Sequence, residues 1–168
     1  ALAVQGAAAE PLWEAIQSAF ATQHVVGARI DPANPEAAPA EAMGLRAGRA
    51  YCVMGAFDMV NVGRILKLRG FMQDPEWRGK WSDGDGAWTN QLRNLLSYQD
   101  ASDGSFWMSL DDFVRYFGEV YLVRMADDRW TRLTVRSRWM DESAGGGPQH
   151  LSWRNSYQWL LGVSRETT

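Results

Sequence analysis

Two strand-like runs separated by a short connection constrain the fold of this chain most. The runs are AYCVMGAF (50–57) and GRILKLRG (63–70), and only the five residues DMVNV join them. Runs of this kind with so short a connection are typical of a β-hairpin. The centre of the chain is therefore expected to be antiparallel sheet.

The residues before this hairpin predict one helix, one strand and one loop. Apolar residues recur at every fourth position over 11–22, behind a proline that suits the first helical turn, so we expect an amphipathic helix there. The run HVVGARI (24–30) predicts a short buried strand. Segment 31–42 holds three prolines and is predicted to be a surface loop with no regular element.

The residues after the hairpin alternate between loop, helix and strand. A stretch rich in Gly, Asp and Trp (71–87) predicts a long functional loop. A helix is expected over 88–99, with Trp88, Leu92, Leu95 and Leu96 on one side. Strands are expected at 106–109 and 119–125. Between them Ser109 opens a helix with Asp112 as its capping-box partner, and its apolar face holds Leu110, Phe113, Val114 and Phe117.

The pattern changes after Asp127 and Asp128. Basic and apolar residues alternate over 129–139, a strand is predicted at 156–163, and no helix pattern follows Phe117. We therefore predict an α+β domain over 1–126. Residues 127–168 are predicted to be the beginning of an all-β unit that is incomplete here.

Composition excludes several classes of protein. Seventeen Lys and Arg face twenty Asp and Glu, which argues against nucleic acid as a partner. Cys52 is the one cysteine, so no disulfide framework is possible, and an unpaired thiol suits a reducing compartment. No run approaches the ~20 apolar residues of a membrane span. The chain does not begin with Met, and we expect it to be part of a longer chain or complex.

Four ordered motifs resemble the second lobe of the calpain protease core. They are GRAYCVMGA (48–56), ILKLRG (65–70), EWRGKWSDGDGAW (76–88) and DGSFWMSLDDFVRYF (103–117). A weaker resemblance over 137–163 is to the β-sandwich that follows this core. The resemblance implies a papain-like second lobe with a bent antiparallel sheet over 1–126. It also implies a calpain-type β-sandwich beginning at 127–168.

The catalytic positions depart from the family pattern. Calpains use a Cys, a His and an Asn, and the Cys belongs to the first lobe, which the motifs do not cover. The family's His position is Arg49 here, and its Asn position is Gly70. A guanidinium cannot accept a proton at neutral pH, and glycine has no side chain to orient an imidazole. The resemblance therefore predicts no catalytic residue in this lobe.

The remaining thiol and imidazoles are expected to be structural. Cys52 stands at a Ser position of the family and is predicted to be a small hydrophobe. His24 lies in an apolar run and His150 in the β-rich tail. Neither has a recognisable spacing from Cys52.

A calcium site follows from the resemblance alone. The family's second-lobe site would fall on Glu76, Asp83, Asp103 and the carbonyl of Ala101. A further family carboxylate is Ser105 here, so the site is expected to be vestigial. The alternative is that Asp83 and Asp103 are turn residues before glycines.

The tryptophans and the late arginines have two interpretations each. The motif tryptophans are predicted to be packing anchors rather than a sugar-binding row; they are Trp77, Trp81, Trp88 and Trp107. The late arginines are expected to line a solvated strand, with peripheral lipid contact as the alternative; they are Arg129, Arg132, Arg136 and Arg138.

Together these features predict a calpain-like pseudoprotease without catalysis. We expect it to bind other proteins as a scaffold inside the cell, in the cytoplasm or in a cytoskeletal or flagellar assembly. No cofactor is expected apart from calcium. Two alternatives stay open: a calcium-responsive regulatory module, or part of an active calpain-type endopeptidase whose nucleophile lies in a missing first lobe.

Overall fold

The computed structural model describes residues 2–3, 9–126, 133–160 and 162. The chain divides into two compact units, residues 1–127 and 128–168. Each unit is described by itself below.

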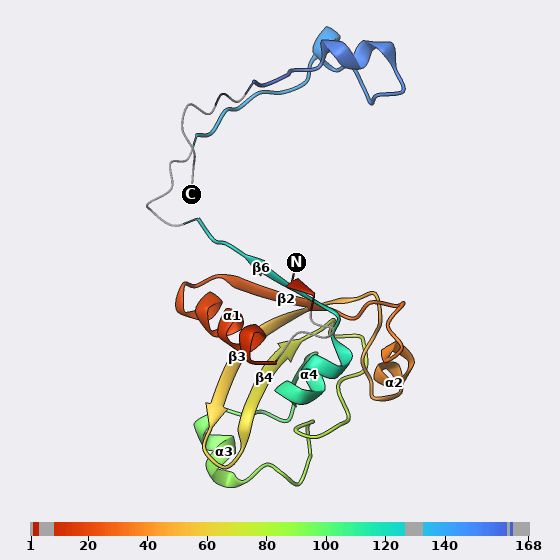
Figure 1. Cartoon of the computed structure of the whole chain (residues 1–168). Coiled ribbons are helices and arrows are strands. Elements are labelled where there is room, and N and C mark those ends of the chain that lie inside the picture. Colours follow the sequence, from red (N-terminus) through yellow and green to blue (C-terminus); the bar gives the residue numbers. More distant parts are fainter. Residues whose placement is uncertain (1, 4–8, 127–132, 161, 163–168) are drawn as a thin grey trace. The chain divides into compact units, whose positions relative to one another are not determined.

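The first unit is built on one six-stranded sheet with the order β1-β6-β2-β3-β4-β5, in which every neighbouring pair is antiparallel (Figure 1). The strands are Leu2–Ala3 (β1), Val25–Arg29 (β2), Ala50–Met59 (β3), Gly63–Arg69 (β4), Ser105–Ser109 (β5) and Glu119–Val123 (β6). The predicted hairpin is confirmed as β3 and β4, joined by three residues. The α+β class expected for this part of the chain is confirmed as well.

Two helices, α1 (Ala9–Ala21) and α4 (Leu110–Tyr116), pack against this sheet (Figure 1). Their apolar residues and those of the sheet form the main core; fully buried members are Ile16, Val26, Leu66, Leu68, Phe113 and Phe117. The cap of α4 is as expected, because the Ser109 hydroxyl accepts from Asp112 N at 3.1 Å. The same hydroxyl donates to the Asp112 carboxylate at 2.7 Å. The helix predicted over 11–22 is confirmed as α1.

The prediction of a loop without regular structure over 31–42 is wrong in its second half. Residues Ala37–Ala42 form a short helix, α2, whose Ala37 and Ala40 are buried. Pro39 is its third residue. The first turn of a helix needs no intrahelical N–H donors, so a proline there breaks no hydrogen bond.

A second, smaller core lies beside the far end of the hairpin and consists of buried Ile65, Trp81, Trp88 and Trp107. The three indoles meet edge to face, with ring centroids 5.1 and 5.7 Å apart. Helix α3 (Asn90–Leu95) lies next to this end in Figure 1. It is shorter than the predicted 88–99, and Leu95, expected on the apolar side, is 70% exposed. The other expected residues of this side do meet the second core, since Trp88 belongs to it and Leu92 and Leu96 pack against it.

The motif tryptophans are packing anchors, as predicted, since all four are at most 6% exposed. Trp77 belongs to the main core, and its indole N–H donates to the Lys80 carbonyl at 2.9 Å. The Trp88 indole donates to the Ser82 carbonyl at 3.0 Å. These bonds hold the long loop between β4 and α3, which contains no helix or strand over 70–89.

The register of the hairpin contains one irregularity. Val53 pairs with Leu68 and Gly55 pairs with Lys67, so Met54 is an extra residue on β3. A bulge of this kind lets one strand gain a residue while the side-chain alternation of both strands stays matched. Residues before and after Met54 therefore keep facing the correct side of the sheet.

The second unit contains two short 3-10 helices, Asp141–Ser143 and Leu151–Asn155. No strand occurs in its described residues, so the strands predicted at 129–139 and 156–163 are wrong over 133–139, 156–160 and 162. Residues 127–132, 161 and 163–168 lie outside the described residues. A strand needs a neighbour to pair with, and no described segment of this unit supplies one. Membership of a β-sandwich stays a prediction.

Candidate functional site

The two positions that correspond to a protease base and its orienting group lie at one end of the hairpin. Strand β3 begins at Ala50 and β4 ends at Arg69. The strands are antiparallel, and Cys52 pairs with Arg69. Arg49, just before β3, and Gly70, just after β4, therefore lie at the same end of the hairpin. These are the two positions at which the resemblance places the family's His and Asn.

Arg49 presents a permanent positive charge at this end. Its side chain is 56% exposed, and its Nε lies 3.7 Å from Oδ2 of Asp74. The guanidinium also stacks over the ring of Phe71, 5.2 Å from the centroid. A guanidinium stays protonated at any pH at which a protein is folded, so it cannot take a proton from a nucleophile.

Gly70 leaves no side chain where an orienting amide would stand. Its backbone N–H donates to the Gly104 carbonyl at 2.8 Å. A Cβ placed on it would lie 2.8 Å from Cε1 of Tyr51. Tyr51 has little room to move, because its ring meets those of Phe106 and Phe117 edge to face and its hydroxyl accepts from Arg46 N at 2.7 Å.

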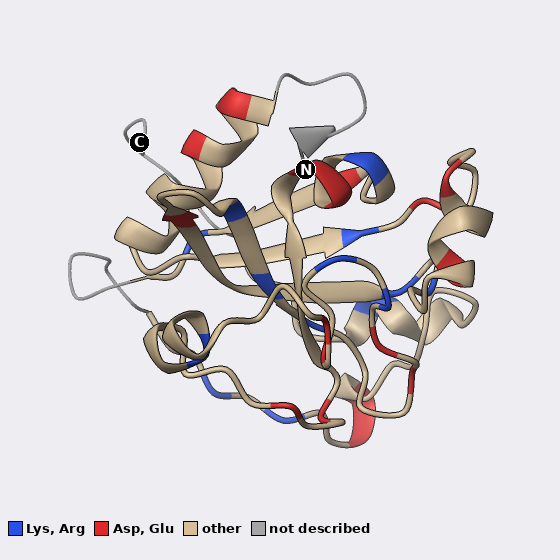
Figure 2. Ribbon diagram, turned by 90° about the horizontal axis from the view of Figure 1, so that it is seen from below, with Lys and Arg blue, Asp and Glu red and all other residues tan. Residues whose placement is uncertain are grey.

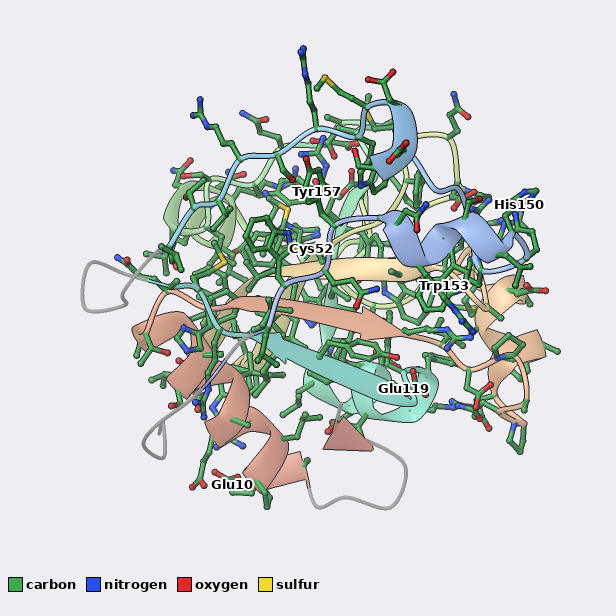
Figure 3. All side chains as sticks on the ribbon, turned by 90° about the horizontal axis from the view of Figure 1, so that it is seen from above. Glu10, Cys52, Glu119, His150, Trp153 and Tyr157 are labelled. Carbon is green, nitrogen blue, oxygen red and sulfur yellow. The ribbon has the colours of Figure 1, made fainter. Side chains whose placement is uncertain are left out.

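Among the residues that the structure describes, no histidine is hydrogen-bonded to Tyr51 or Cys52. Burial raises the pKa of the Tyr51 hydroxyl, although the hydrogen bond from Arg46 opposes this. Cys52 is exposed on β3 (Figure 3), and its thiol donates to the carbonyl of Val53 at 3.8 Å. His24 precedes β2, where its Nδ1 bonds the Thr22 carbonyl at 2.9 Å rather than a thiol. A thiol without an acceptor nitrogen is a weak nucleophile.

The positions implied for calcium lie on two loops that their carboxylates tie together. Glu76 accepts from Gly104 N at 2.7 Å, and Asp83 accepts from Ala101 N at 3.2 Å. Asp103 accepts from Ser105 N at 2.8 Å, while the Ala101 carbonyl accepts from Asp103 N at 2.8 Å. Every implied ligand therefore has a backbone partner.

The electrostatics of these carboxylates differ. Desolvation raises the pKa of Asp83, and the charges of Glu76 and Asp100 act in the same direction. The hydrogen bonds from Ser105 lower the pKa of Asp103. Over the residues that the structure describes, no three His, Cys, Asp or Glu side chains gather closely enough to hold a metal ion. Whether calcium binds at Glu76, Asp83, Ala101 and Asp103 stays a prediction.

Charge and hydropathy add little to the site. Basic and acidic residues are interspersed along the ribbon in Figure 2. Among the described helices, none has the length and apolar character needed to cross a membrane. Two of the late arginines, Arg136 and Arg138, are exposed, and Arg129 and Arg132 lie outside the described residues.

The first unit has an antiparallel sheet with helices packed on it and a tryptophan-rich loop. The two positions that correspond to catalytic residues lie at one end of its hairpin. Together these features define a lobe of a cysteine protease core. The chain belongs to the calpain family, because the model of "Calpain family cysteine protease" matches residues 2–124.

Three relatives illustrate the relationship. The chain is 33% identical to the calpain-type cysteine protease DEK1 of Arabidopsis thaliana over 70% of its own length and 6% of that protein. It is 31% identical to calpain-8 of Mus musculus over 83% of its length and 22% of the relative. It is 29% identical to the calpain-2 catalytic subunit of Mus musculus over 92% of its length and 24% of the relative. The chain thus spans less than a quarter of each of these relatives.

Two features of the site were not predicted from the sequence. One is Asp74, which pairs with Arg49 from the irregular loop and belongs to no periodic pattern. The other is a shallow hollow beside Gly70, described below. Its signal was present, because Gly27 of β2 and Ala50 and Cys52 of β3 are small at positions where a strand normally carries larger residues.

Proposed function

We propose that this lobe is a pseudoprotease that takes no part in peptide-bond cleavage and acts as a protein-binding module. The observation that carries the proposal is the pair Arg49 and Gly70 at the shared end of β3 and β4. One has the wrong protonation state for a base, and the other has no side chain.

The expected loss of rate is large. Positioned general acid–base catalysis contributes typically ~10²–10⁴-fold, and the nucleophile of a cysteine protease depends on the same base for its activation. A thiol supplied by another lobe would meet a guanidinium held by Asp74 and Phe71. At this position no group can accept the proton of the thiol, and none can transfer a proton to a leaving amine.

A binding role is compatible with this loss because the framework does not depend on the catalytic groups. The strands, helices and tryptophans that carry the exposed surface near Cys52 and Gly70 are held in place by the two buried cores. A role as an intracellular scaffold, in cytoskeletal or flagellar assemblies, follows from the resemblance to degenerate calpain-like proteins. The support from this chain is the exposed surface near Cys52 and Gly70.

The test is a graft of this chain in place of the matching segment of the mouse calpain-2 catalytic subunit. Cleavage of a fluorogenic calpain substrate is measured with and without Ca²⁺. We expect no turnover above background, and partial recovery when the graft carries Arg49→His together with Gly70→Asn. Turnover by the unaltered graft, or turnover by the chain itself that Cys52→Ser abolishes, would contradict the proposal.

The second candidate is a calcium-responsive regulatory module. Its support is that Glu76 and Asp83 lie on one loop, Asp103 lies on another, and the Glu76 and Asp83 carboxylates accept hydrogen bonds from backbone N–H groups of the second loop. Calorimetry with Ca²⁺ separates the candidates. Binding in the millimolar range or weaker favours the scaffold, whereas tight binding lost in Asp83→Asn favours the regulator.

A further inference from the structure

A shallow hollow of about 350 Å³ lies on the open face of the sheet, beside the Arg49–Gly70 end of the hairpin. The lining residues that matter for its chemistry are Val25, Gly27, Ala50, Cys52, Arg69 and Phe71. Three of them are small, which is why the surface dips here. The exposed apolar side chains of Val25 and Phe71 are 44% and 60% accessible.

The strand register explains this arrangement. Tyr121, Gly27, Cys52 and Arg69 are successive partners across β6, β2, β3 and β4, so they form one row on one face. Gly27 and Cys52 form the floor of the hollow, with Tyr121 and Arg69 on either side. The Tyr121 hydroxyl is engaged, because it donates to the carboxylate of Glu119. Arg69 is therefore the polar group that this row offers to a ligand.

Arg69 has no ion-pair partner among the described residues. Its side chain is exposed. An unpaired guanidinium beside an apolar hollow favours a ligand that brings a carboxylate and apolar groups together.

The apolar residues fix the spacing of that ligand. β2 runs antiparallel to β3, so Val25 lies toward Met54, and Phe71 follows β4 toward Ala50. The row of Cys52 and Arg69 lies midway between these levels. Alternate side chains of an extended peptide point to one side, roughly 7 Å apart. A matching segment therefore has an apolar residue two positions before and two positions after the acidic one.

A carboxylate can also come from the C-terminus of a chain, but the backbone of the hollow does not favour a terminus. Chain termini are typically captured by free backbone N–H groups. Gly27, Cys52 and Arg69 each have a strand paired on both sides, so their N–H groups belong to the sheet. Recognition must come from side chains.

We propose that this hollow binds an extended segment of a partner protein with the pattern apolar-x-Glu/Asp-x-apolar, whose carboxylate pairs with Arg69. The inference rests on the proposed function, since it names the partner chemistry of the same surface. It does not depend on the absence of turnover, which the graft measures separately.

The experiment uses the full 168-residue chain and acetylated, amidated peptide pools of the form φ-Ser-X-Ser-φ, where φ is a mixture of Leu, Ile, Val and Phe. X is Glu, Gln or Lys, and a fourth pool has Gln at X and a free C-terminal carboxylate. Binding is measured by fluorescence polarisation. We expect the Glu pool to bind about three- to fivefold more tightly than the Gln pool, because the ion pair is partly exposed to solvent.

Three variants locate the site. Arg69→Gln should remove the preference for Glu, Arg69→Lys should retain part of it, and Arg78→Gln, an equal change of charge on the loop after β4, should leave it unchanged. Gly27→Val should weaken binding of both pools. A Cβ at Gly27 meets its nearest atoms at 3.7 and 3.9 Å, so the backbone tolerates this change while the methyl groups fill the hollow.

Several results would overturn the proposal. They are equal binding of the Glu and Gln pools, no binding of any pool, retention of the Glu preference in Arg69→Gln, or tightest binding of the pool with a free C-terminus. Thermal unfolding of each variant, compared with that of the unaltered chain, establishes that the loss of binding is not a loss of folding.

Discussion

The same face of the β3–β4 hairpin is covered at one end and bare at the other. At the covered end, Phe57 and Ile65 pair across the strands; Ile65 is buried with the tryptophans, and the Phe57 ring, which is 37% exposed, lies 5.4 Å from that of Trp107. At the bare end, Cys52 and Arg69 pair on this face and are exposed. Lys67 lies between them, with its ammonium 5.4 Å from the Trp107 ring centroid.

The difference separates what holds this lobe together from what such a lobe could do chemically. The covered end contains the buried rings of Trp81, Trp88 and Trp107, and the Trp88 indole N–H donates to the Ser82 carbonyl, so substitutions there cost stability. The bare end has small or charged side chains that contribute little to either core. Exposed side chains of the bare end, such as Cys52 and Arg69, can therefore change with little effect on folding, whereas Gly70 lies against Tyr51 of the main core.

The largest expected effect is at the covered end. Trp107→Ala should lower the free energy of unfolding by about 3–5 kcal/mol, because a ring that is 2% exposed leaves a cavity among the other tryptophans. Chemical denaturation of the chain measures it. The matched control is Trp139→Ala in the second unit, where the ring is 70% exposed and a change within about 0.5 kcal/mol is expected. Equal losses for both variants would contradict the argument that burial of the Trp107 ring is what stabilises the covered end.

A smaller effect is expected where the bare end touches the main core. Gly70→Asn should cost about 1–3 kcal/mol, because its Cβ meets the Tyr51 ring at 2.8 Å and the ring is held by Phe106 and Phe117. Gly86→Asn is the control, since nothing lies within 4 Å of a Cβ there. If Gly70→Asn proves neutral in thermal unfolding, Tyr51 moves more freely than its contacts indicate.

The smallest effects concern pH and have opposite signs on the two connected loops. The pKa of Asp83 is raised above its usual 3.8, so the folded state holds that proton more tightly than the unfolded state and is penalised once the group ionises. Asp83→Asn should therefore be more stable than the unaltered chain at pH 7. This advantage should disappear as pH falls through the raised pKa.

Asp103 should behave in the opposite way, because its folded-state pKa lies below 3.8. Its carboxylate contributes stability above the unfolded pKa, and this contribution is lost as pH falls through the folded one. Asp103→Asn should thus be less stable at pH 7, with the difference vanishing in acid. Thermal melts between pH 3 and pH 7 measure both variants, and a common sign for the two would contradict the assignment.

Local patterns predicted most of the first unit. Helix α1 has a full apolar stripe behind Pro11, and α4 has a serine cap, so each contains its own signal. The hairpin was recognisable because its connection is short. Helix α2 was not, because segment 31–42 holds three prolines and no apolar stripe that would single out Pro39 as a residue of a first helical turn.

Tertiary context decided the remainder. Leu95 fits the apolar stripe in the sequence, yet it is exposed, while Leu92 and Leu96 of the same stripe pack against the second core. The alternation over 129–139 resembles a strand, but pairing partners determine strands, and the described residues of the second unit provide none. At the site, the family motifs placed Arg49 and Gly70, whereas the contacts of Asp74 and Tyr51 required coordinates.

The extra residue at Met54 determines which face of the sheet the side chains of β3 point to. Counting from Phe57 without it, the alternation would turn Cys52 and Ala50 toward the helices and would expose Tyr51 and Val53, which are at most 4% accessible. Because of this one inserted residue, the alternation of side chains before Met54 and the alternation after it both match the two faces of the sheet. The extra residue thus places the covered end and the bare end on the same face of the hairpin.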